Sequence, residues 1–468
     1  MSLTLHPKQG KALLTTATEV LYGGAAGGGK SHLLRVAAIT WCRAVAGLQI
    51  YLFRREFPDL YKNHMDGPAG FPALLAAWTR EGFARFNRSD HHVAFANGSK
   101  IHLCHCQRQH DVYAYQGADI HVLMIDELTQ WTAAMYAFLR GRLRLGGLAV
   151  PAAWQGRFPR ALCGANPGGI GHNWVKAAFV DLAPPGAVTP MPAAEGGMAR
   201  QYLPARLEDN PTLLGNDPAY AARLEGLGDP ALVRAMRQGD WNIVAGGMFD
   251  DLWRPETHVV APFGVPAGWR IDRSFDWGSS RPFSVGWWAE SDGTDLTMPD
   301  GEVRPTVPGD LFRIAEWYGW NGRPDAGCRM LAAEIARGIL AREAAMGLAG
   351  RVRPGPADSS IFDVENGNSI ADDMGRAGVR WLRADKSPGS RRQGWQRLRA
   401  LLKGAGSGEA PGLYVAETCR HFIRTVPVLP RSDRRPDDVD SAAEDHVADE
   451  TRYRVLAGRR GNAAGELW

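Results

Sequence analysis

The fold of the first half of the chain is decided by the stretch Gly24-Ala25-Ala26-Gly27-Gly28-Gly29-Lys30-Ser31, called the phosphate loop below. It satisfies every fixed position of the pattern G-x-x-x-x-G-K-[ST]. Its glycines allow positive φ and close approach, so that successive N–H groups can converge on phosphate oxygens. Lys30 adds a positive charge at the phosphates, and the Ser31 hydroxyl is a ligand for Mg²⁺. The stretch therefore predicts a nucleoside triphosphate site, with ATP as the ligand.

The segments on either side supply the setting that such a loop needs. Residues 19–22 have the apolar character of a short buried strand, and residues 31–38 have the pattern of a helix. A simple turn is the alternative, because the chain contains 55 glycines in 468 residues. The Lys-Ser ending and the order strand, loop, helix favour the nucleotide site.

A second ATPase signature lies at residues 121–127, where an apolar run ends in the adjacent carboxylates Asp126 and Glu127. The run is too short for a surface helix and predicts a buried parallel strand. At the end of such a strand Asp126 can hold Mg²⁺, and Glu127 can polarise the water that attacks the γ-phosphate. A strand that ends in a solvated acidic turn is the alternative, which Lys30 in the same chain disfavours.

Two amides fit the same site. Gln9 offers paired donor and acceptor groups that can read the edge of adenine, although a polar residue that merely opens the first helix explains it nearly as well. Asn166 follows another apolar strand, residues 160–165. There its amide can sense the γ-phosphate and couple hydrolysis to movement.

The order of these motifs resembles one known family. A Gln motif, a phosphate loop, an Asp-Glu strand and the turn Gly164-Ala165-Asn166-Pro167 follow one another as in the large terminase subunit of tailed bacteriophages or prophages. The resemblance extends from about Leu5 to Tyr453. It implies an α/β fold with an N-terminal P-loop ATPase domain of the RecA or ASCE type, which has a parallel sheet. A C-terminal RNase H-like nuclease domain with a mixed sheet is implied to follow.

The resemblance also implies metal-binding carboxylates in the second half. Residues 273–278 begin a second α/β pattern, in which Asp276 stands where the family has its first metal ligand. Asp358 ends the segment 350–358 and matches the second ligand. Cleavage of a phosphodiester by two metal ions needs several carboxylates, and hard oxygen ligands suit Mg²⁺ or Mn²⁺.

A third element completes this set. Residues 444–453 closely match the family's Asp-His-x-x-Asp-x-x-Arg-Tyr signature and place Asp445, His446 and Asp449 within one helical turn. Asp449 is the favoured ligand, with His446 or Asp445 as a further contributor, and the sequence leaves this choice open.

One departure from the family concerns an arginine. The phosphate loop lacks the arginine that some members carry within it. Arg54 and Arg55, which end the strand-like segment 49–55, are candidates for stabilising charge in cis, and a neighbouring subunit could supply an arginine in trans. A solvated strand end explains both residues equally well.

Bulk composition is compatible with this interpretation. A chain of 468 residues can hold two domains. It has no apolar run near the roughly 18 residues of a membrane span, and its N-terminus lacks a basic segment followed by an apolar one. These features predict a soluble protein of the host cytoplasm, which the resemblance places transiently at the portal vertex of a procapsid.

The formal net charge of +4 predicts local rather than global basicity. The clearest basic segment is residues 386–403. Its guanidinium and ammonium groups can follow DNA phosphates without reading sequence, and a charged surface helix without a partner is the alternative. The candidate DNA-binding residues are Lys386, Arg391, Arg392 and Arg397.

Breaks rich in Pro, Gly and Ala predict the domain limits. We expect an ATPase domain at 1–200, a linker subdomain at 201–265, a nuclease domain at 266–456 and a flexible tail at 457–468. Six scattered cysteines exclude a disulfide framework.

Motifs and resemblance together predict ATP-driven translocation of double-stranded DNA into a procapsid, with metal-dependent endonucleolytic cutting of concatemeric DNA. The implied partners are double-stranded DNA, the portal protein and the small terminase subunit, with a ring of subunits on the portal. The sequence does not decide between cos-type and headful cutting, or the size of the ring.

The leading alternative is a P-loop helicase or repair ATPase whose second half is a nucleic-acid-binding module without nuclease activity. In that case Asp276, Asp358 and Asp449 should not converge.

Overall fold

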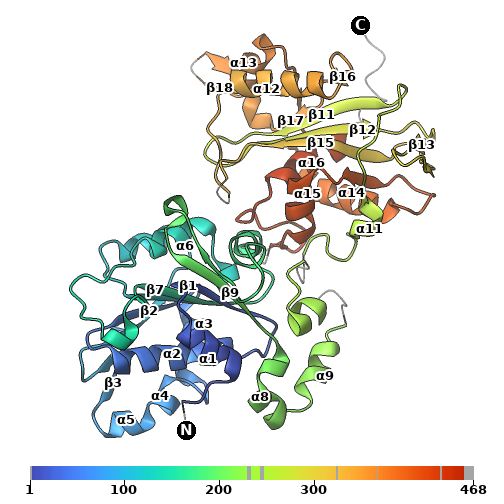
Figure 1. Cartoon of the computed structure of the whole chain (residues 1–468). Coiled ribbons are helices and arrows are strands. Elements are labelled where there is room, and N and C mark those ends of the chain that lie inside the picture. Colours follow the sequence, from blue (N-terminus) through green and yellow to red (C-terminus); the bar gives the residue numbers. More distant parts are fainter. Residues whose placement is uncertain are drawn as a thin grey trace. The chain divides into compact units, whose positions relative to one another are not determined.

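The structure is a computed structural model, which describes residues 3–228, 233–242, 247–322, 325–365, 367–432 and 435–457. By their internal contacts the residues form two compact units, Met1–Gly246 and Gly247–Trp468 (Figure 1). Apart from Ala457, the predicted tail lies outside the described residues. No helix in the described ranges has the length and apolar character needed to cross a membrane.

A nine-stranded sheet forms the centre of the first unit, with the order β3-β4-β5-β2-β6-β7-β1-β9-β8. The strands from β5 to β9 in this order are parallel, and β3, β4 and β8 extend the sheet with antiparallel pairings. The bounds are β1 Glu19–Gly24, β2 Gln49–Arg54, β3 Ala84–Asn87, β4 His92–Phe95, β5 Lys100–His105, β6 Val122–Asp126, β7 Arg160–Ala165, β8 Val188–Pro190 and β9 Ala199–Ala205.

Helices cover both faces of this sheet. Strands β1, β6 and β7 are buried along their whole length, as expected of central parallel strands that are covered on both faces. One apolar cluster includes residues of α1 and α2, and the other includes residues of α6 and α7. The helices are α1 Pro7–Leu14, α2 Lys30–Ala44, α3 Phe57–Tyr61, the π-helix η1 Lys62–Asp66, α4 Phe71–Leu74, α5 Ala76–Arg80, α6 Ala133–Arg140, α7 His172–Val175, α8 Pro211–Asn216 and α9 Tyr220–Glu225.

The described residues up to 242 of the predicted linker subdomain pack on the first unit. Asn210 Nδ2 donates to the carbonyl of Gly27 at 2.7 Å, and the N–H of Ala26 donates to the carbonyl of Met236 at 2.7 Å. The segment after β9 thus contacts the phosphate loop directly. The limits predicted for the linker subdomain stay predictions.

The second unit is built on an eight-stranded mixed sheet of order β10-β21-β15-β12-β11-β17-β20, with β16 also paired to β11. Strands β11, β12 and β15 form an antiparallel meander, and β17, β20 and β21 join it in parallel. The bounds are β10 Val259–Val260, β11 Arg270–Asp276, β12 Ser284–Glu290, β15 Leu311–Tyr318, β16 Val352–Arg353, β17 Pro356–Ala357, β20 Leu382–Arg383 and β21 Leu413–Ala416, with small hairpins β13 Leu296–Thr297 with β14 Val303–Arg304 and β18 Val364–Glu365 with β19 Asn368–Ser369.

Helices flank the second sheet as well: α12 and α13 lie on one side, and α14, α15 and α16 on the other (Figure 1). The α-helices described in this unit are α11 Pro255–His258, α12 Ala332–Ala345, α13 Ile370–Arg376, α14 Ser390–Gly404, α15 Arg420–Thr425 and α16 His446–Ala457. The predicted α/β fold is confirmed, with a largely parallel sheet in the first unit and a mixed sheet in the second.

Helix α16 is fixed to this sheet by two buried ion pairs. Glu450 pairs with Arg313 of β15, and both side chains are fully buried. One turn further on, Arg454 pairs with Asp272 of β11, and these side chains are 4% and 1% exposed. These two pairs therefore fix the position of α16 relative to β15 and β11.

Replacing Glu450 with Ala should destabilise the protein by about 3–5 kcal/mol, because it leaves the Arg313 guanidinium buried without its main partner. Urea unfolding followed by tryptophan fluorescence measures the change. The exposed Glu409→Ala is the matched control and should stay within about 0.5 kcal/mol of wild type. Equal stabilities of the two variants would show that the buried pair does not hold the helix.

Candidate functional sites

The first site lies where the parallel strands of the first unit end. Gly24 ends β1, Asp126 ends β6 and Asn166 directly follows β7, which places all three at the carboxyl edge of the sheet, where open α/β sheets bind ligands. Gly27 and Gly29 have φ of 76° and 75°. This left-handed conformation is strained for other residues, so the loop requires glycine at both positions.

The phosphate loop brings its functional side chains together with Asp126. Lys30 Nζ donates to the carbonyl of Ala25 at 2.8 Å, and Ser31 Oγ donates to Asp126 Oδ2 at 3.1 Å. Burial lowers the pKa of Lys30 to about 8, although the charges of Asp126 and Glu127 oppose the shift. The predicted phosphate, magnesium and water-activating groups therefore share one site.

Three side chains that surround Asp126 are absent from the predicted nucleotide-binding set. Arg54 Nε lies 3.2 Å, Asn63 Nδ2 3.2 Å and His64 Nε2 3.1 Å from Asp126 Oδ2. Burial opposes ionisation, but the hydrogen bond from His64 and the charge of Arg54 hold the pKa of Asp126 well below its usual value. Asn63 and His64 lie on the π-helix η1, which no sequence pattern marks.

Glu127 has an unusual backbone and a charged partner. Its φ of 63° lies in the left-handed region, where a non-glycine residue stores strain that is typical of functional sites. Arg54 Nη2 donates to Glu127 Oε1 at 2.5 Å. Burial raises the pKa of Glu127, with Arg54 opposing the shift. Of the two candidate arginines Arg54 is at the site, whereas Arg55 donates to Met135 Sδ.

The two amides occupy different positions at this site. Gln9 Nε2 donates to the carbonyl of Gly29 at 2.9 Å, and Gln9 Oε1 accepts from the N–H of His6 at 2.8 Å. Gln9 thus supports the phosphate loop, and its contact with adenine stays a prediction. Asn166 accepts a hydrogen bond from Thr129 through its backbone carbonyl. Within the described ranges no donor reaches its buried Oδ1.

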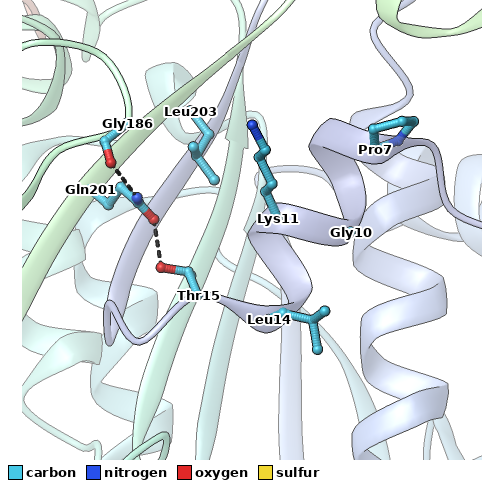
Figure 2. Close-up of a pocket in the computed structure, with 8 residues that line it drawn as sticks. All are labelled: Pro7, Gly10, Lys11, Leu14, Thr15, Gly186, Gln201 and Leu203. Carbon is cyan, nitrogen blue, oxygen red and sulfur yellow. Dashed lines mark hydrogen bonds between the residues drawn. The ribbon is translucent and has the colours of Figure 1, made fainter.

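A pocket of about 620 Å³ lies beside α1 and contains none of these nucleotide residues (Figure 2). Gln201 is one of the residues that line the pocket. Its Oε1 accepts a hydrogen bond from Thr15 Oγ1 at 2.7 Å, and its Nε2 donates to the carbonyl of Gly186 at 2.6 Å. The lining residues are Pro7, Gly10, Lys11, Leu14, Thr15, Gly186, Gln201 and Leu203.

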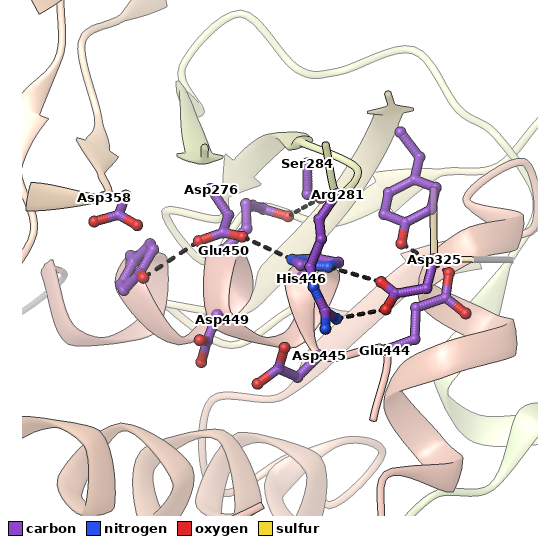
Figure 3. A network of polar contacts seen from close by, with 12 residues as sticks. Asp276, Arg281, Ser284, Asp325, Asp358, Glu444, Asp445, His446, Asp449 and Glu450 are labelled. Carbon is purple, nitrogen blue, oxygen red and sulfur yellow. Dashed lines mark hydrogen bonds and ion pairs between the residues drawn. The ribbon is translucent and has the colours of Figure 1, made fainter. Parts of the chain in front are cut away.

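The second site lies in the second unit around Asp276, the last residue of β11 (Figure 3). Tyr453 Oη donates to Asp276 Oδ1 at 3.3 Å, and His446 Nδ1 lies 3.3 Å from Asp276 Oδ2. His446 Nε2 lies 3.1 Å from Asp325 Oδ1. Both His446 and Tyr453 come from α16, which therefore brings the C-terminal signature onto the first predicted carboxylate.

The remaining predicted carboxylates each contact a cation. Lys386 Nζ pairs with Asp358 at 2.5 Å. Arg391 Nη1 donates to Asp449 at 3.0 Å, and its Nη2 donates to Asp445 at 3.3 Å. The side chains of Asp358, Asp445 and Asp449 are only 15%, 12% and 15% exposed.

The pKa values show how closely these charges interact. Burial and the charges of Asp449 and Asp358 raise the pKa of Asp276 to about 6, against the effect of His446. Burial and Asp449 raise the pKa of Asp445 to about 7. Burial alone would lower the pKa of His446, but hydrogen bonds to Asp276 and Asp325 raise it to about 10. Asp276, Asp358 and Asp449 therefore interact within one cluster, called the carboxylate cluster below together with Asp445 and His446.

The described residues contain no group of three or more His, Cys, Asp or Glu side chains placed to hold a metal ion. The donors of the carboxylate cluster nevertheless fit Mg²⁺ or Mn²⁺ chemically, since they are carboxylate oxygens and one imidazole. Their negative charge is balanced by His446, Lys386 and Arg391, cations of the chain itself. The metal-ligand roles stay predictions.

Most of the predicted DNA-binding residues have acidic partners. Lys386 and Arg391 contact the carboxylate cluster, and Arg391 also pairs with Asp438 at 2.7 Å. Arg392 pairs with Asp437 at 2.7 Å on the surface, and Arg397 lies on α14. Asp437 and Asp438, which follow residue 436, thus neutralise part of the basic segment, and this pairing was not predicted from the sequence. DNA contact by these four residues stays a prediction.

No protein-family model and no curated protein matches the chain. Among solved structures, the large terminase of a thermophilic bacteriophage aligns over 97% of this chain and 98% of its own, with 14% identity and a TM-score of 0.40. The large terminase of bacteriophage HK97 aligns over 97% and 95%, with 10% identity and a TM-score of 0.41. The nuclease domain of the P22 large terminase aligns over 46% and 95%, with 18% identity and a TM-score of 0.32. The chain thus has similarity to large terminases, the family that its motifs resemble.

The pKa of His446 predicts a pH-dependent contribution to stability in metal-free buffer. Its pKa is about 10 in the folded chain and about 6.5 when unfolded. The stabilisation is therefore fully present below pH ~6.5 and is lost as pH rises towards about 10. The free energy of unfolding of wild type should exceed that of His446→Gln more at pH 6 than at pH 10. The exposed His110→Gln is the control, and a difference for His446→Gln that does not change with pH would contradict the assignment.

Proposed function

We propose that the chain is a large terminase subunit that translocates double-stranded DNA into a procapsid with ATP and cuts concatemeric DNA with metal ions. The observation that carries this proposal is the presence of two sites in one chain. The phosphate loop lies against Asp126 in the first unit, and the second unit brings Asp276, Asp358 and Asp449 into one cluster. The interaction of these three carboxylates supports a nuclease centre over the alternative of a helicase or repair ATPase without one.

In the first unit the phosphate loop binds ATP through its backbone N–H groups and Lys30. Ser31 and Asp126, already in contact at 3.1 Å, are the groups that would hold Mg²⁺, which neutralises phosphate charge when bound. Glu127 orients the attacking water. We assign the charge-stabilising role in cis to Arg54, because it already contacts both Asp126 and Glu127.

Asn166 is assigned the coupling role. Its carbonyl is fixed by Thr129, and its buried Oδ1 has no donor within the described ranges. A buried acceptor without a partner costs free energy, so a ligand or water that donates to it would be favoured. The Asn166 amide directly follows β7, so its hydrogen bonding can change when nucleotide binds or leaves.

Replacing Glu127 with Gln should lower ATP turnover by about 10²-fold or more, because the amide cannot accept a proton from water. ATP binding should persist, since Lys30 and the loop are unchanged. Phosphate release and binding of a fluorescent ATP analogue measure the two properties. The exposed Glu56→Gln is the matched control, and a Glu127→Gln variant with wild-type turnover would contradict this role.

In the second unit Asp276, Asp358 and Asp449 would hold the nuclease metals, with Asp445 and His446 beside them. When bound, two divalent ions supply an activated water and stabilise the leaving oxygen of the phosphodiester. The chain itself contributes the fixed carboxylates, of which Asp276 is the most enclosed at 8% side-chain exposure. Tyr453 and His446 hold this carboxylate from opposite oxygens.

Replacing Asp276 with Asn should abolish metal-dependent cleavage of plasmid DNA, with a loss of at least about 10²-fold, and leave ATPase activity intact, because the amide is a far weaker metal ligand than the carboxylate. Agarose gels with Mg²⁺ or Mn²⁺ measure cleavage, and the exposed Asp295→Asn is the matched control. Wild-type protein that hydrolyses ATP but cuts no DNA in either metal would favour the helicase or repair ATPase instead.

The partners follow from this function. We assign double-stranded DNA as substrate, the portal protein and the small terminase subunit as partners, and a ring of subunits at the portal vertex as the working assembly in the host cytoplasm. These assignments rest on the motif resemblance.

A further inference from the structure

The histidine of the C-terminal signature lies between two carboxylates, of which sequence analysis identified only one. His446 Nδ1 is 3.3 Å from Asp276 Oδ2, and His446 Nε2 is 3.1 Å from Asp325 Oδ1 (Figure 3). The two contacts use both nitrogens of the ring. The orientation of the imidazole is therefore set at one end by the carboxylate cluster and at the other by Asp325.

Asp325 is itself fixed by an ion pair with a neighbouring loop. It follows β15, and its φ of 52° lies in the left-handed region, which costs free energy for an aspartate. Arg281, from the loop between β11 and β12, pairs with Asp325 Oδ2. One carboxylate oxygen thus contacts Arg281 and the other contacts His446, so the side chain has little freedom to turn away.

Histidines that ligate metal ions commonly donate their second N–H to a carboxylate, which fixes the ring and makes the ligating nitrogen more basic. His446 and Asp325 have this relation, and the other ring nitrogen, Nδ1, faces Asp276. To act as a ligand Nδ1 would release its proton to solvent when the ion binds. The other candidate for the extra ligand, Asp445, contacts the guanidinium of Arg391. Asp449 contacts the same guanidinium, so Arg391 does not separate the candidates. The contact between His446 and Asp325 is what favours His446 as the additional ligand.

We propose that Asp325 is a positioning residue of the nuclease centre, which holds His446 so that Nδ1 is presented to a divalent ion bound at Asp276. The inference rests on the proposed nuclease function and adds a residue from outside the predicted ligand set. Arg281 supports it by keeping Asp325 oriented towards the ring. Asp325 acts only through His446 and contacts neither the metal ion nor DNA.

The test is Mn²⁺ binding to the full-length chain without nucleotide, followed by pulsed EPR of the bound ion. The nuclease site is identified as the Mn²⁺ signal that disappears when Asp276 is replaced with Asn. Wild type should show hyperfine coupling to a ¹⁴N nucleus at this site, and His446→Gln should not. Asp325→Ala should lose or weaken the coupling and lower Mn²⁺ affinity by about 10–100-fold, with ATPase activity unchanged.

Two further variants make the result specific. Asp325→Glu restores a carboxylate and should recover part of the affinity and of the cleavage rate, whereas the exposed Asp300→Asn should resemble wild type throughout. Thermal unfolding of each variant identifies any that fails to fold. If Mn²⁺ affinity and ¹⁴N coupling recover together in Asp325→Glu, the result supports a role in positioning His446. An effect on stability alone would not change the coupling.

Two results would overturn the inference. The first is wild-type protein that cuts DNA and binds Asp276-dependent Mn²⁺ without nitrogen coupling, which leaves the proposed function standing. The second is Asp325→Ala with wild-type coupling and affinity. If wild type neither cuts DNA nor binds Asp276-dependent Mn²⁺, the proposed nuclease function falls and the inference falls with it.

Discussion

The position of helix α16 on the sheet of the second unit is the constraint on which the second site depends. Two buried ion pairs, Glu450 with Arg313 and Arg454 with Asp272, tie the helix to β15 and β11. Because a helix presents neighbouring turns on one face, fixing Glu450 also fixes His446, which lies 3.3 Å from Asp276. A buried pair of this kind adds little net stability over apolar residues of similar volume, but removing one partner is costly.

Both sites gather negative charge in buried surroundings and balance it with cations of the chain. At the nucleotide site Arg54 lies against Asp126 and Glu127. In the carboxylate cluster the balance comes from His446 and Arg391. Uncompensated carboxylates at this burial would shift their pKa and lose their charge, as Asp276 partly does with a pKa of about 6. A divalent ion bound at these carboxylates would take over the positive charge that His446, Lys386 and Arg391 now provide.

The sequence predicts those parts of the two sites that lie at the ends of regular strands. The phosphate loop and Asp126 follow buried apolar runs, and such runs mark parallel strands whose ends meet at one edge. His64 and Asp325 could not be predicted, because they lie on a π-helix and in a loop that carry no periodic pattern. Arg391 was predicted as a DNA contact because its charge is visible in sequence, whereas its acidic partners come from segments some fifty residues away.

The proposed function requires the second unit to hold divalent metal ions in the carboxylate cluster of a chain that also binds ATP. Anomalous diffraction from crystals soaked in Mn²⁺ tests it most directly, because each bound ion appears as a peak that requires no assay of activity. A manganese peak in contact with Asp276, Asp358 and Asp449 is the expected result. Crystals in which none of these three carboxylates contacts manganese would contradict it.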